Sequence, residues 1–257
     1  EEEKDDGRSQ LPLFDSGRTY TINFTKRGII HSDLVNAVSP QYARDILTPK
    51  YGEGLDKLLR ENRGKLYGIL NGIDYDIFSP ATDKNIKVRY DLNSIEKKYA
   101  NKALLQQAFG LKEEKDVPLI GMASRLAAQK GIDMIMRIMP SLLKLNFQFV
   151  VVGSGEERYQ DFFWQLAQEY PKRVAAHLNF DTAIASEIYA ASDIYLMPSE
   201  FEPCGLTQLI AMKYGSIPVV HSTGGLTDTV ENFNPANASG TGFTFKEYEE
   251  NSLLIAL

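Results

Sequence analysis

Two segments of the sequence are the most informative about its architecture: Ser-Glu-Phe-Glu-Pro-Cys-Gly-Leu-Thr-Gln-Leu over 199–209 and Ser-Thr-Gly-Gly-Leu-Thr-Asp-Thr-Val over 222–230. Each of these glycine-containing turns follows a short apolar run and leads into a helix-like segment. In an open parallel sheet, such turns lie at the carboxyl ends of neighbouring strands, where ligands bind. The second turn offers backbone N–H groups to a diphosphate, and Glu202 in the first is an acceptor for sugar hydroxyls. The two turns together favour a nucleotide-sugar site over two ordinary connections.

Outward from these turns, apolar strand-like runs alternate with helix-like segments. This alternation predicts an α/β fold with a doubly wound parallel sheet. The helical pattern over 132–143 has one apolar face, and Pro140 within it predicts a kink, a break or the helix end. Residues 94–108 have the charge mix and capping signal of a surface helix. The five strand-like runs are 117–123, 147–152, 174–180, 194–197 and 217–220.

The composition limits the possible partners. The 257 residues, 43% hydrophobic and 24% charged, are typical of a soluble globular protein of one or two domains. A net charge of −6 argues against a nucleic-acid partner, and no apolar run approaches the roughly 18 residues that span a membrane. The single Cys204 fits a reducing, cytoplasmic setting, and three scattered histidines form no metal-ligand pattern. We therefore expect no metal, no membrane partner and no nucleic acid.

Two cations follow the first strand of the predicted sheet, in Ser-Arg-Leu-Ala-Ala-Gln-Lys-Gly over 124–131. Arg125 can bind a diphosphate with two parallel hydrogen bonds, and Lys130 can bind it as a point charge. Fixed cations also stabilise the charge that a leaving nucleoside diphosphate gains. The alternative is two solvated charges. The Gly-Ser-Gly turn over 153–155 lacks a full dinucleotide pattern, and it suits packing as well as contact near a nucleotide.

Four motifs resemble those of one enzyme family. Phe-Glu-Pro-Cys-Gly-Leu-Thr-Gln over 201–208 and Thr-Gly-Gly-Leu-Thr-Asp-Thr-Val over 223–230 resemble the signature turns of bacterial glycogen synthases and plant starch synthases. The motifs at 124–131 and 188–193 resemble two more, and the likeness extends over nearly the whole chain from about Tyr20. The resemblance implies a GT-B glycosyltransferase that moves glucose from ADP-glucose to the non-reducing end of an α-1,4-glucan, glycogen or starch, with retention. It needs no cofactor, and it implies a cytoplasmic location, or a plastid in a plant.

The resemblance also implies roles for residues. Glu202, Lys130 and Arg125 would be catalytic, and Tyr189 would stack on adenine, with a buried core tyrosine as the alternative. Cys204 would be a small packed residue near the sugar, since no paired base accompanies it. We assign no role to His221. The implied donor-binding set is Arg125, Lys130, Tyr189, Glu202, Cys204, Gly205, Thr223, Gly224, Gly225 and Leu226.

The resemblance divides the chain into parts of a longer protein. Residues 1–68 would be the end of the acceptor-side domain, with 1–19 a tail or loop. Residues 69–245 would be the nucleotide-sugar domain, and 246–257 would begin a crossover helix. The family's amino-terminal Lys-x-Gly-Gly-Leu motif is missing, so the chain is interpreted as a fragment. We expect that the fragment binds the donor and can fail to catalyse alone.

One departure from related enzymes favours this family, and two alternatives stay open. Related retaining transferases have a second glutamate eight positions after the first, where this chain has Ile210. That absence is typical of the glycogen and starch synthase branch. A related retaining transferase using another nucleotide sugar, such as UDP-glucose, remains an alternative, because no residue selects adenine uniquely. A non-catalytic nucleotide- or carbohydrate-binding module is a further alternative, disfavoured by the presence of all three proposed catalytic residues.

Overall fold

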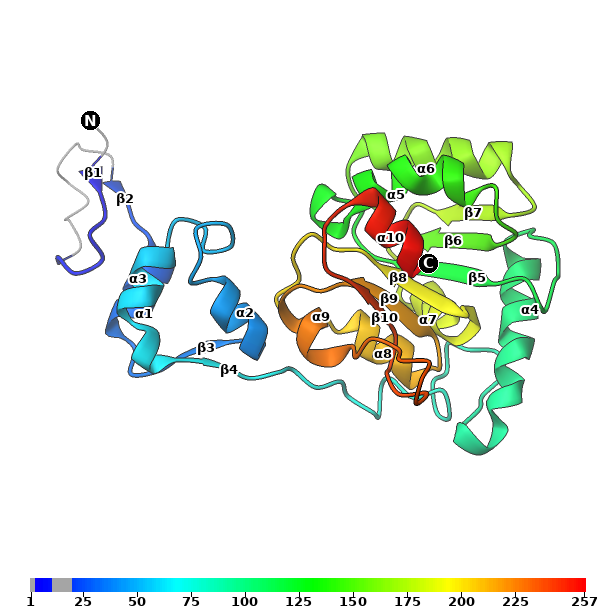
Figure 1. The fold of residues 1–257 in the computed structure, drawn as a ribbon, viewed down its shortest axis with the longest axis horizontal. Coiled ribbons are helices and arrows are strands. Elements are labelled where there is room, and N and C mark those ends of the chain that lie inside the picture. The colour runs from blue at the N-terminus through cyan, green and yellow to red at the C-terminus, as the bar shows by residue number, and fades with distance from the viewer. Residues whose placement is uncertain (1–2, 11–19) are drawn as a thin grey trace. The chain divides into compact units, whose positions relative to one another are not determined.

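A computed structural model describes residues 3–10 and 20–257. The chain forms two compact units, Glu1–Leu70 and Asn71–Leu257 (Figure 1). The boundary between them lies two residues from the one expected after residue 68. The acceptor-side and donor-side assignments of these units, and the crossover helix expected from residue 246, stay predictions. Of the tail or loop expected over 1–19, residues 1–2 and 11–19 lie outside the described residues.

The first unit contains short strands and helices. β3 and β4 pair in parallel, as do β1 and β2. Arg27 on α1 forms an ion pair of 2.6 Å with Asp5, and the neighbouring Lys26 donates to the Asp5 carbonyl at 2.7 Å, so both cations bind within their own unit. The elements are β1 (Glu3–Lys4), β2 (Tyr20–Thr21), α1 (Phe24–His31), β3 (Val35–Ala37), α2 (Pro40–Asp45), α3 (Asp56–Glu61), a 3₁₀ helix (Arg63–Lys65) and β4 (Leu66–Gly68).

The second unit is built on a parallel sheet of six strands, in the order β10-β9-β8-β5-β6-β7. Its connections run outward in both directions from β5, so the strand order reverses between β5 and β8. The five predicted strands are confirmed, whereas β10 was missed because its three residues are too short to show a pattern. The strands are β5 (Leu119–Ala123), β6 (Gln148–Val152), β7 (Val174–His177), β8 (Ile194–Met197), β9 (Ile217–His221) and β10 (Phe243–Phe245).

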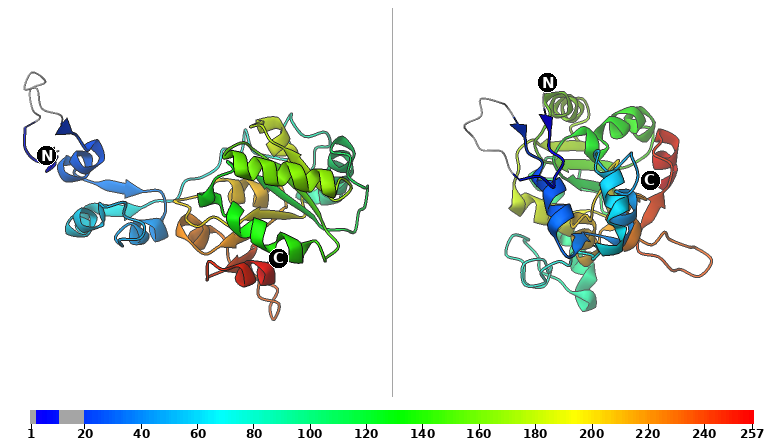
Figure 2. Two further views of the ribbon diagram at one scale, coloured as in Figure 1. Left: turned by 90° about the horizontal axis from the view of Figure 1, so that it is seen from above. Right: turned by 90° about the vertical axis from the view of Figure 1, so that its left-hand side faces the viewer.

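Helices lie on both sides of this sheet (Figures 1 and 2). Alternate side chains of the inner strands enter opposite clusters, as β6 shows: Val150 and Val152 join one, and Phe149 and Val151 join the other. The first cluster includes residues of α4 (Lys98–Ala108), α7 (Thr182–Ala191), α8 (Thr207–Lys213) and α9 (Gly224–Thr229). The second includes residues of α5 (Ile132–Leu142), α6 (Glu157–Glu169) and α10 (Glu250–Ala256).

Two helices differ in detail from the expectation. α5 passes through Pro140 and ends two residues later, at Leu142, so the helix end is the nearest of the three predicted outcomes. The segment 94–108 begins with a 3₁₀ helix (Leu92–Lys97) and continues as α4. The prediction of a surface helix is wrong for one face of α4, which buries Lys98, Asn101, Lys102 and Gln106. These polar side chains can be buried because they are hydrogen-bonded to neighbouring segments.

Candidate functional site

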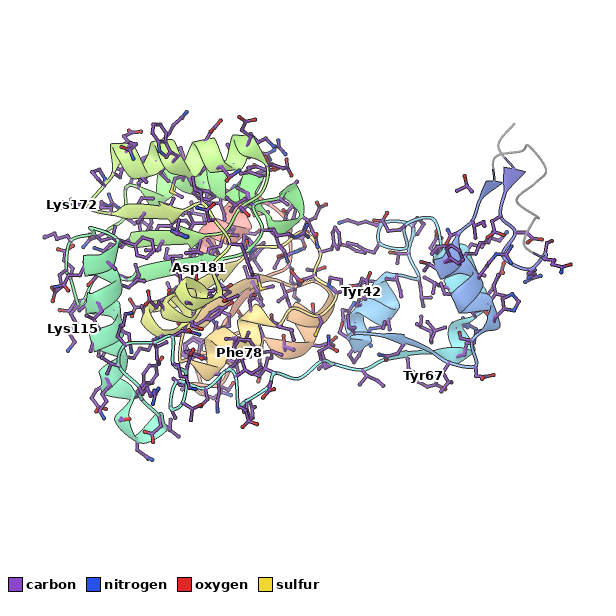
Figure 3. All side chains as sticks on the ribbon, turned by 180° about the vertical axis from the view of Figure 1, so that it is seen from behind. Tyr42, Tyr67, Phe78, Lys115, Lys172 and Asp181 are labelled. Atoms are coloured by element: carbon purple, nitrogen blue, oxygen red, sulfur yellow. The ribbon has the colours of Figure 1, made fainter. Side chains whose placement is uncertain are left out.

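A pocket of about 410 Å³ lies at the carboxyl ends of β5, β6 and β8. This is where the strand order reverses, the usual place for a ligand in an open α/β sheet. Its lining is mostly apolar, with Arg125 and Lys130 as its cationic side chains. Phe78 and Asp181, labelled in Figure 3, belong to the same lining. The pocket therefore combines an apolar interior with positive charge, which suits a nucleoside carrying phosphates.

The centre of the site is an ion pair between Lys130 and Glu202. The Nζ atom of Lys130 donates to Oε2 of Glu202 at 2.6 Å, and the two side chains are only 16% and 10% exposed. Ser199 donates its hydroxyl to the same oxygen at 3.1 Å. The sequence predicted both charged residues as site residues, and the fold brings them together from segments 72 positions apart.

The loop that carries the cations is tied to the Glu202 turn through Gln129. The backbone N–H of Glu200 donates to the carbonyl of Gln129 at 2.9 Å, and the Gln129 amide donates to the carbonyl of Phe201 at 3.2 Å. Gly131 follows with a φ of 75°, and a Cβ there would lie 2.1 Å from the Pro198 carbonyl oxygen. Only glycine permits this close approach, which fixes the loop that carries Lys130 against the end of β8.

Arg125 lies at the exposed edge of the site. Its guanidinium donates to the Gln129 side chain at 3.4 Å, a long contact that a phosphate can replace. The backbone next to it is held firmly, because Leu126 exchanges hydrogen bonds with the Gly-Ser-Gly turn. The N–H of Leu126 donates to Ser154 at 2.9 Å, and the N–H of Glu156 donates to Leu126 at 2.8 Å. These contacts support the packing interpretation of that turn.

His221 has a structural role that the sequence did not indicate. Its Nδ1 atom lies 2.9 Å from the Ser199 carbonyl oxygen, so that nitrogen carries the proton and donates. The imidazole ring is buried and lies 5.3 Å from the Phe245 ring and 5.0 Å from the Tyr248 ring. The His221 side chain thus holds Ser199, the first residue of the turn that carries Glu202.

The second signature turn packs directly beneath the first. The N–H of Gly225 donates to the carbonyl of Glu202 at 3.0 Å, and a Cβ on Gly225 would lie 2.1 Å from the Cys204 carbonyl oxygen. Thr223 and Leu226 are buried, 5% and 0% exposed. The sequence predicted that the backbone N–H groups of this turn are open to a diphosphate. That prediction does not hold for Gly225, because its N–H already donates to Glu202. The donor contacts of 223–226 stay a prediction.

Cys204 and Gly205 complete the Glu202 turn. Cys204 is a buried free cysteine, and burial raises the pKa of its thiol. A thiol with a raised pKa is protonated at neutral pH and is a poor nucleophile, in line with the packing role expected from the sequence. Gly205 has a left-handed φ of 70° and comes just before α8. Direct contact between either residue and a sugar stays a prediction.

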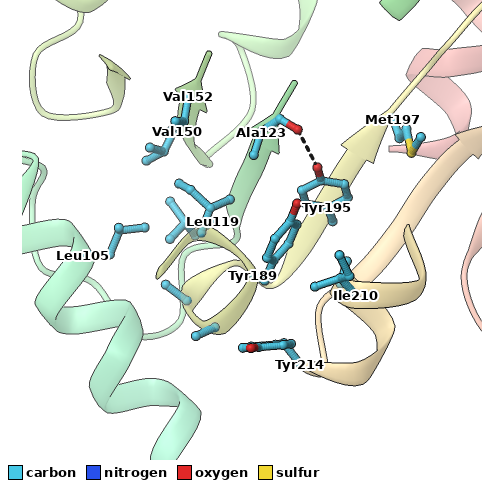
Figure 4. Packing of buried hydrophobic residues seen from close by; sticks show 14 of the residues in the cluster. Leu105, Leu119, Ala123, Val150, Val152, Tyr189, Tyr195, Met197, Ile210 and Tyr214 are labelled. Atoms are coloured by element: carbon cyan, nitrogen blue, oxygen red, sulfur yellow. Dashed lines mark hydrogen bonds between the residues drawn. The ribbon is translucent and has the colours of Figure 1, made fainter. Parts of the chain in front are cut away.

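The aromatic residues of the pocket fall into two groups. Tyr189 is 5% exposed, and its ring packs 5.2 Å from Tyr195 and 6.1 Å from Tyr214, measured between ring centroids (Figure 4). Phe180 also lines the pocket but is 77% exposed, so it offers an open aromatic face. Stacking of adenine on Tyr189 stays a prediction, and Phe180 is a second candidate. Phe180 directly precedes Asp181, the N-cap of α7. This position at the end of a strand-like run could have marked Phe180 as a pocket residue in the sequence.

Neither a metal site nor a membrane span is found in the described part of the chain. Over residues 3–10 and 20–257, no group of three or more His, Cys, Asp or Glu side chains is placed to hold a metal ion. Over the same residues, no helix is long and apolar enough to cross a bilayer.

Two family descriptions match this chain. The description "Glycosyl transferases group 1" matches residues 106–256, and "Starch synthase catalytic domain" matches residues 5–61. The glycogen synthase of Kosmotoga olearia is 52% identical over 235 residues, which are 91% of this chain and 49% of the relative. That of Thermosipho melanesiensis is 49% identical over 236 residues, 92% of this chain and 49% of the relative. The chain thus spans about half the length of the curated relatives it matches.

Solved structures of related proteins share the fold of this chain. The catalytic domain of starch synthase IV from Arabidopsis thaliana, bound to ADP and acarbose, is 40% identical with a TM-score of 0.83, covering 90% of this chain and 48% of that one. A sucrose-phosphate synthase from Thermosynechococcus elongatus, 22% identical with a TM-score of 0.61 over 90% of this chain and 50% of that one, shares the fold. The predicted α/β fold class of GT-B glycosyltransferases is confirmed.

Proposed function

The chain belongs to the group 1 glycosyl transferases, and from this premise we propose that it is the donor-binding half of a glycogen or starch synthase. The complete protein would transfer glucose from ADP-glucose to the non-reducing end of an α-1,4-glucan, with retention. One observation carries the proposal: Lys130 and Glu202 meet at 2.6 Å beside a pocket at the reversal of strand order. The pair supports the proposal because a cation that would bind phosphate lies beside a carboxylate that would bind sugar hydroxyls.

Each side chain would act on a different part of the donor. The nucleoside would occupy the apolar part of the pocket, and Arg125 and Lys130 would bind the diphosphate. Glu202 would accept hydrogen bonds from glucose hydroxyls. As the bond between glucose and diphosphate breaks, negative charge grows on the phosphate next to Lys130 and positive charge grows on the sugar next to Glu202. Both charges would therefore be stabilised more in the transition state than in the ground state.

Binding of the donor would change the partner of Lys130. Without ligand, its ammonium donates to Glu202, and an ammonium has three donors. A diphosphate would use the remaining donors or replace the carboxylate. Glu202 would keep the hydrogen bond from Ser199 and turn its other oxygen to the sugar. The pair thus keeps both charges in place until the donor arrives.

The partners of the complete protein belong to the same proposal. The starch synthase IV structure contains ADP and acarbose, which supports a nucleotide and a glucan-type partner for this chain's relatives. We extend this to ADP-glucose as the donor and to glycogen or starch as the acceptor. A cytoplasmic location, or a plastid in a plant, is the setting we propose.

Calorimetric titration with ADP and UDP tests the proposal. We expect the chain to bind ADP more tightly than UDP, and Lys130→Ala to weaken ADP binding at least tenfold because a phosphate loses its cation. Lys144→Ala removes an exposed lysine of the α5–β6 connection and serves as the matched control, with unchanged affinity. A preference for UDP would indicate another nucleotide sugar. Equal ADP affinity in the Lys130 variant and the wild type would refute the assignment of the phosphate site.

A further inference from the structure

Lys98, outside the pocket, holds an ammonium group in the interior of the second unit. The residue is 8% exposed. Its Nζ atom donates to the carbonyl oxygens of Tyr189 at 3.1 Å and Ala190 at 3.0 Å, and to the hydroxyl of Ser216 at 3.0 Å. An ammonium has three donors, so this arrangement uses each of them. None of these three partners is a carboxylate.

The two carbonyls belong to the last turn of α7. Carbonyls at the carboxyl end of a helix lack partners within the helix and carry partial negative charge, so a cation there is favourable. The Ser216 hydroxyl, in turn, lies 2.7 Å from the Tyr189 carbonyl oxygen and 2.6 Å from that of Ser192. Lys98 and Ser216 together fasten the end of α7 from two different segments.

α7 forms one wall of the pocket. Tyr189 is in the last turn of α7 and lines the pocket, and the Tyr195 ring packs against it (Figure 4). The Tyr195 hydroxyl donates to the Ala123 carbonyl at 2.9 Å, two residues before Arg125. The pocket residues on this helix and its cap are Asp181, Thr182, Ala185, Ser186 and Tyr189.

We propose that Lys98 is a positioning residue, whose ammonium fixes the carboxyl-terminal turn of α7 and thereby the wall of the nucleotide pocket. This inference rests on the proposed function of that pocket. An apolar side chain at this position would avoid the cost of burying a charge, but it would remove the ammonium from both helix carbonyls. Tyr189 would then keep the Ser216 hydroxyl at 2.7 Å, and Ala190 the long contact of 3.4 Å from the Tyr90 hydroxyl. The end of α7 could then shift, and the pocket lining would shift with it.

The charge on Lys98 makes the wall sensitive to pH. Burial is the main cause that lowers the pKa of Lys98 to about 7, with Asp193 raising it and Lys102 lowering it further. The neighbouring Tyr189 stays neutral, because burial raises its pKa well above the usual value. Burial also raises the pKa values of Tyr90 and Tyr214, which surround the same helix end. When Lys98 loses its proton, its neutral amine has two N–H donors for three acceptors. The hydrogen bonds that hold the end of α7 therefore weaken as the pH rises through 7.

Calorimetric titration of the whole chain with ADP, at pH 6.0 and pH 8.5, tests the inference. We expect Lys98→Met to weaken ADP binding about tenfold at pH 6.0. From pH 6.0 to pH 8.5, the ADP affinity of the wild type should fall about threefold more than that of this variant. The comparison isolates Lys98, because the titration of ADP itself affects both proteins equally. Gln106→Leu is the matched control: it is buried on the same face of α4, but it binds Gln148 and the Glu114 carbonyl. We expect it to bind ADP within twofold of wild type.

The outcomes separate this inference from the proposed function. Wild type that fails to bind ADP contradicts the proposed function. Wild type that binds, with Lys98→Met equal to it at both pH values, overturns the role of Lys98. Should the methionine variant fail to fold, amide hydrogen exchange of wild type decides, after correction for the intrinsic rate. The last turn of α7 should then lose at least threefold protection between pH 6.0 and 8.5 while α5 does not, and equal changes in both helices would overturn the inference.

Discussion

Two lysine–carboxylate pairs occupy opposite ends of β5 and β8, and they differ in what they leave unused. At the amino ends, Lys102 donates to Asp193, to the Lys115 carbonyl and to the Val117 carbonyl, each at 2.7 Å. At the carboxyl ends, the Lys130 ammonium donates to Glu202 at 2.6 Å, the only hydrogen-bond partner of that ammonium in the described part of the chain. The first ammonium has no donor left, whereas the second has two. A saturated pair serves the fold, and an unsaturated pair can serve a ligand.

Removal of one partner from the saturated pair should have the largest effect. Lys102→Met leaves the Asp193 carboxylate with the Leu119 N–H, which donates to it at 2.8 Å. We expect a loss of about 3–5 kcal/mol in the free energy of unfolding, measured by urea denaturation. Lys130→Met removes one hydrogen bond instead of three and leaves Glu202 the Ser199 hydroxyl, so it should cost less, about 2 kcal/mol. Equal losses in the two variants would remove the distinction between the pairs.

Lys98 is a second buried lysine of α4. It lies one turn before Lys102 and has no carboxylate partner among its hydrogen bonds. The folded pKa of about 7 lies below the unfolded value of 10.5. Between these pH values the unfolded chain binds a proton that the folded chain lacks, so stability should rise with pH above 7. We expect this residue to contribute roughly 3 kcal/mol between pH 7 and pH 10.

Urea denaturation of wild type and Lys98→Met across that pH range measures this contribution. The slope due to Lys98 should be absent from the methionine variant, while slopes due to other groups remain in both. ADP affinity is expected to fall over the same range in which stability rises. Parallel stability curves for the two proteins would show that Lys98 keeps its ordinary pKa in the folded chain.

Substitution of the aromatic residues of the pocket should have a smaller effect than the lysine substitutions, and for Phe180 the effect should be on ADP affinity. Phe180→Leu removes an exposed ring, and we expect ADP binding to weaken about five- to thirtyfold, as for loss of one base–aromatic contact of roughly 1–2 kcal/mol. Stability should change little, because Phe180 is 77% exposed. Tyr189→Leu should instead lower stability by about 2 kcal/mol or more, with a weaker effect on ADP. The reverse pattern would restore Tyr189 as the base-stacking residue.

Local patterns placed three charged residues of the candidate site at one edge of the sheet, and contacts between distant segments explain what those patterns missed. Arg125, Lys130 and Glu202 each follow an apolar strand run, so the sequence alone could place them at one edge of the sheet. Lys98 was read as a surface charge, since nothing near it in sequence shows that carbonyls 91 and 92 positions later would bind it. Ser-Thr-Gly-Gly indicated free N–H groups, yet the Gly225 N–H binds Glu202. Packing between turns cannot be read from either turn alone.

The smallest effect tests the unsaturated pair itself. Glu202→Gln removes the anion that competes with phosphate for Lys130, so ADP should bind about three- to tenfold more tightly, for a change of roughly 1 kcal/mol. ADP-glucose should gain less than ADP, because the sugar loses a charged acceptor while the phosphates gain a cation. Calorimetry with both ligands measures this difference, and Glu200→Gln on the same turn is the matched control, expected to change neither affinity. Equal gains for ADP and ADP-glucose would mean that Glu202 holds Lys130 but does not bind the sugar.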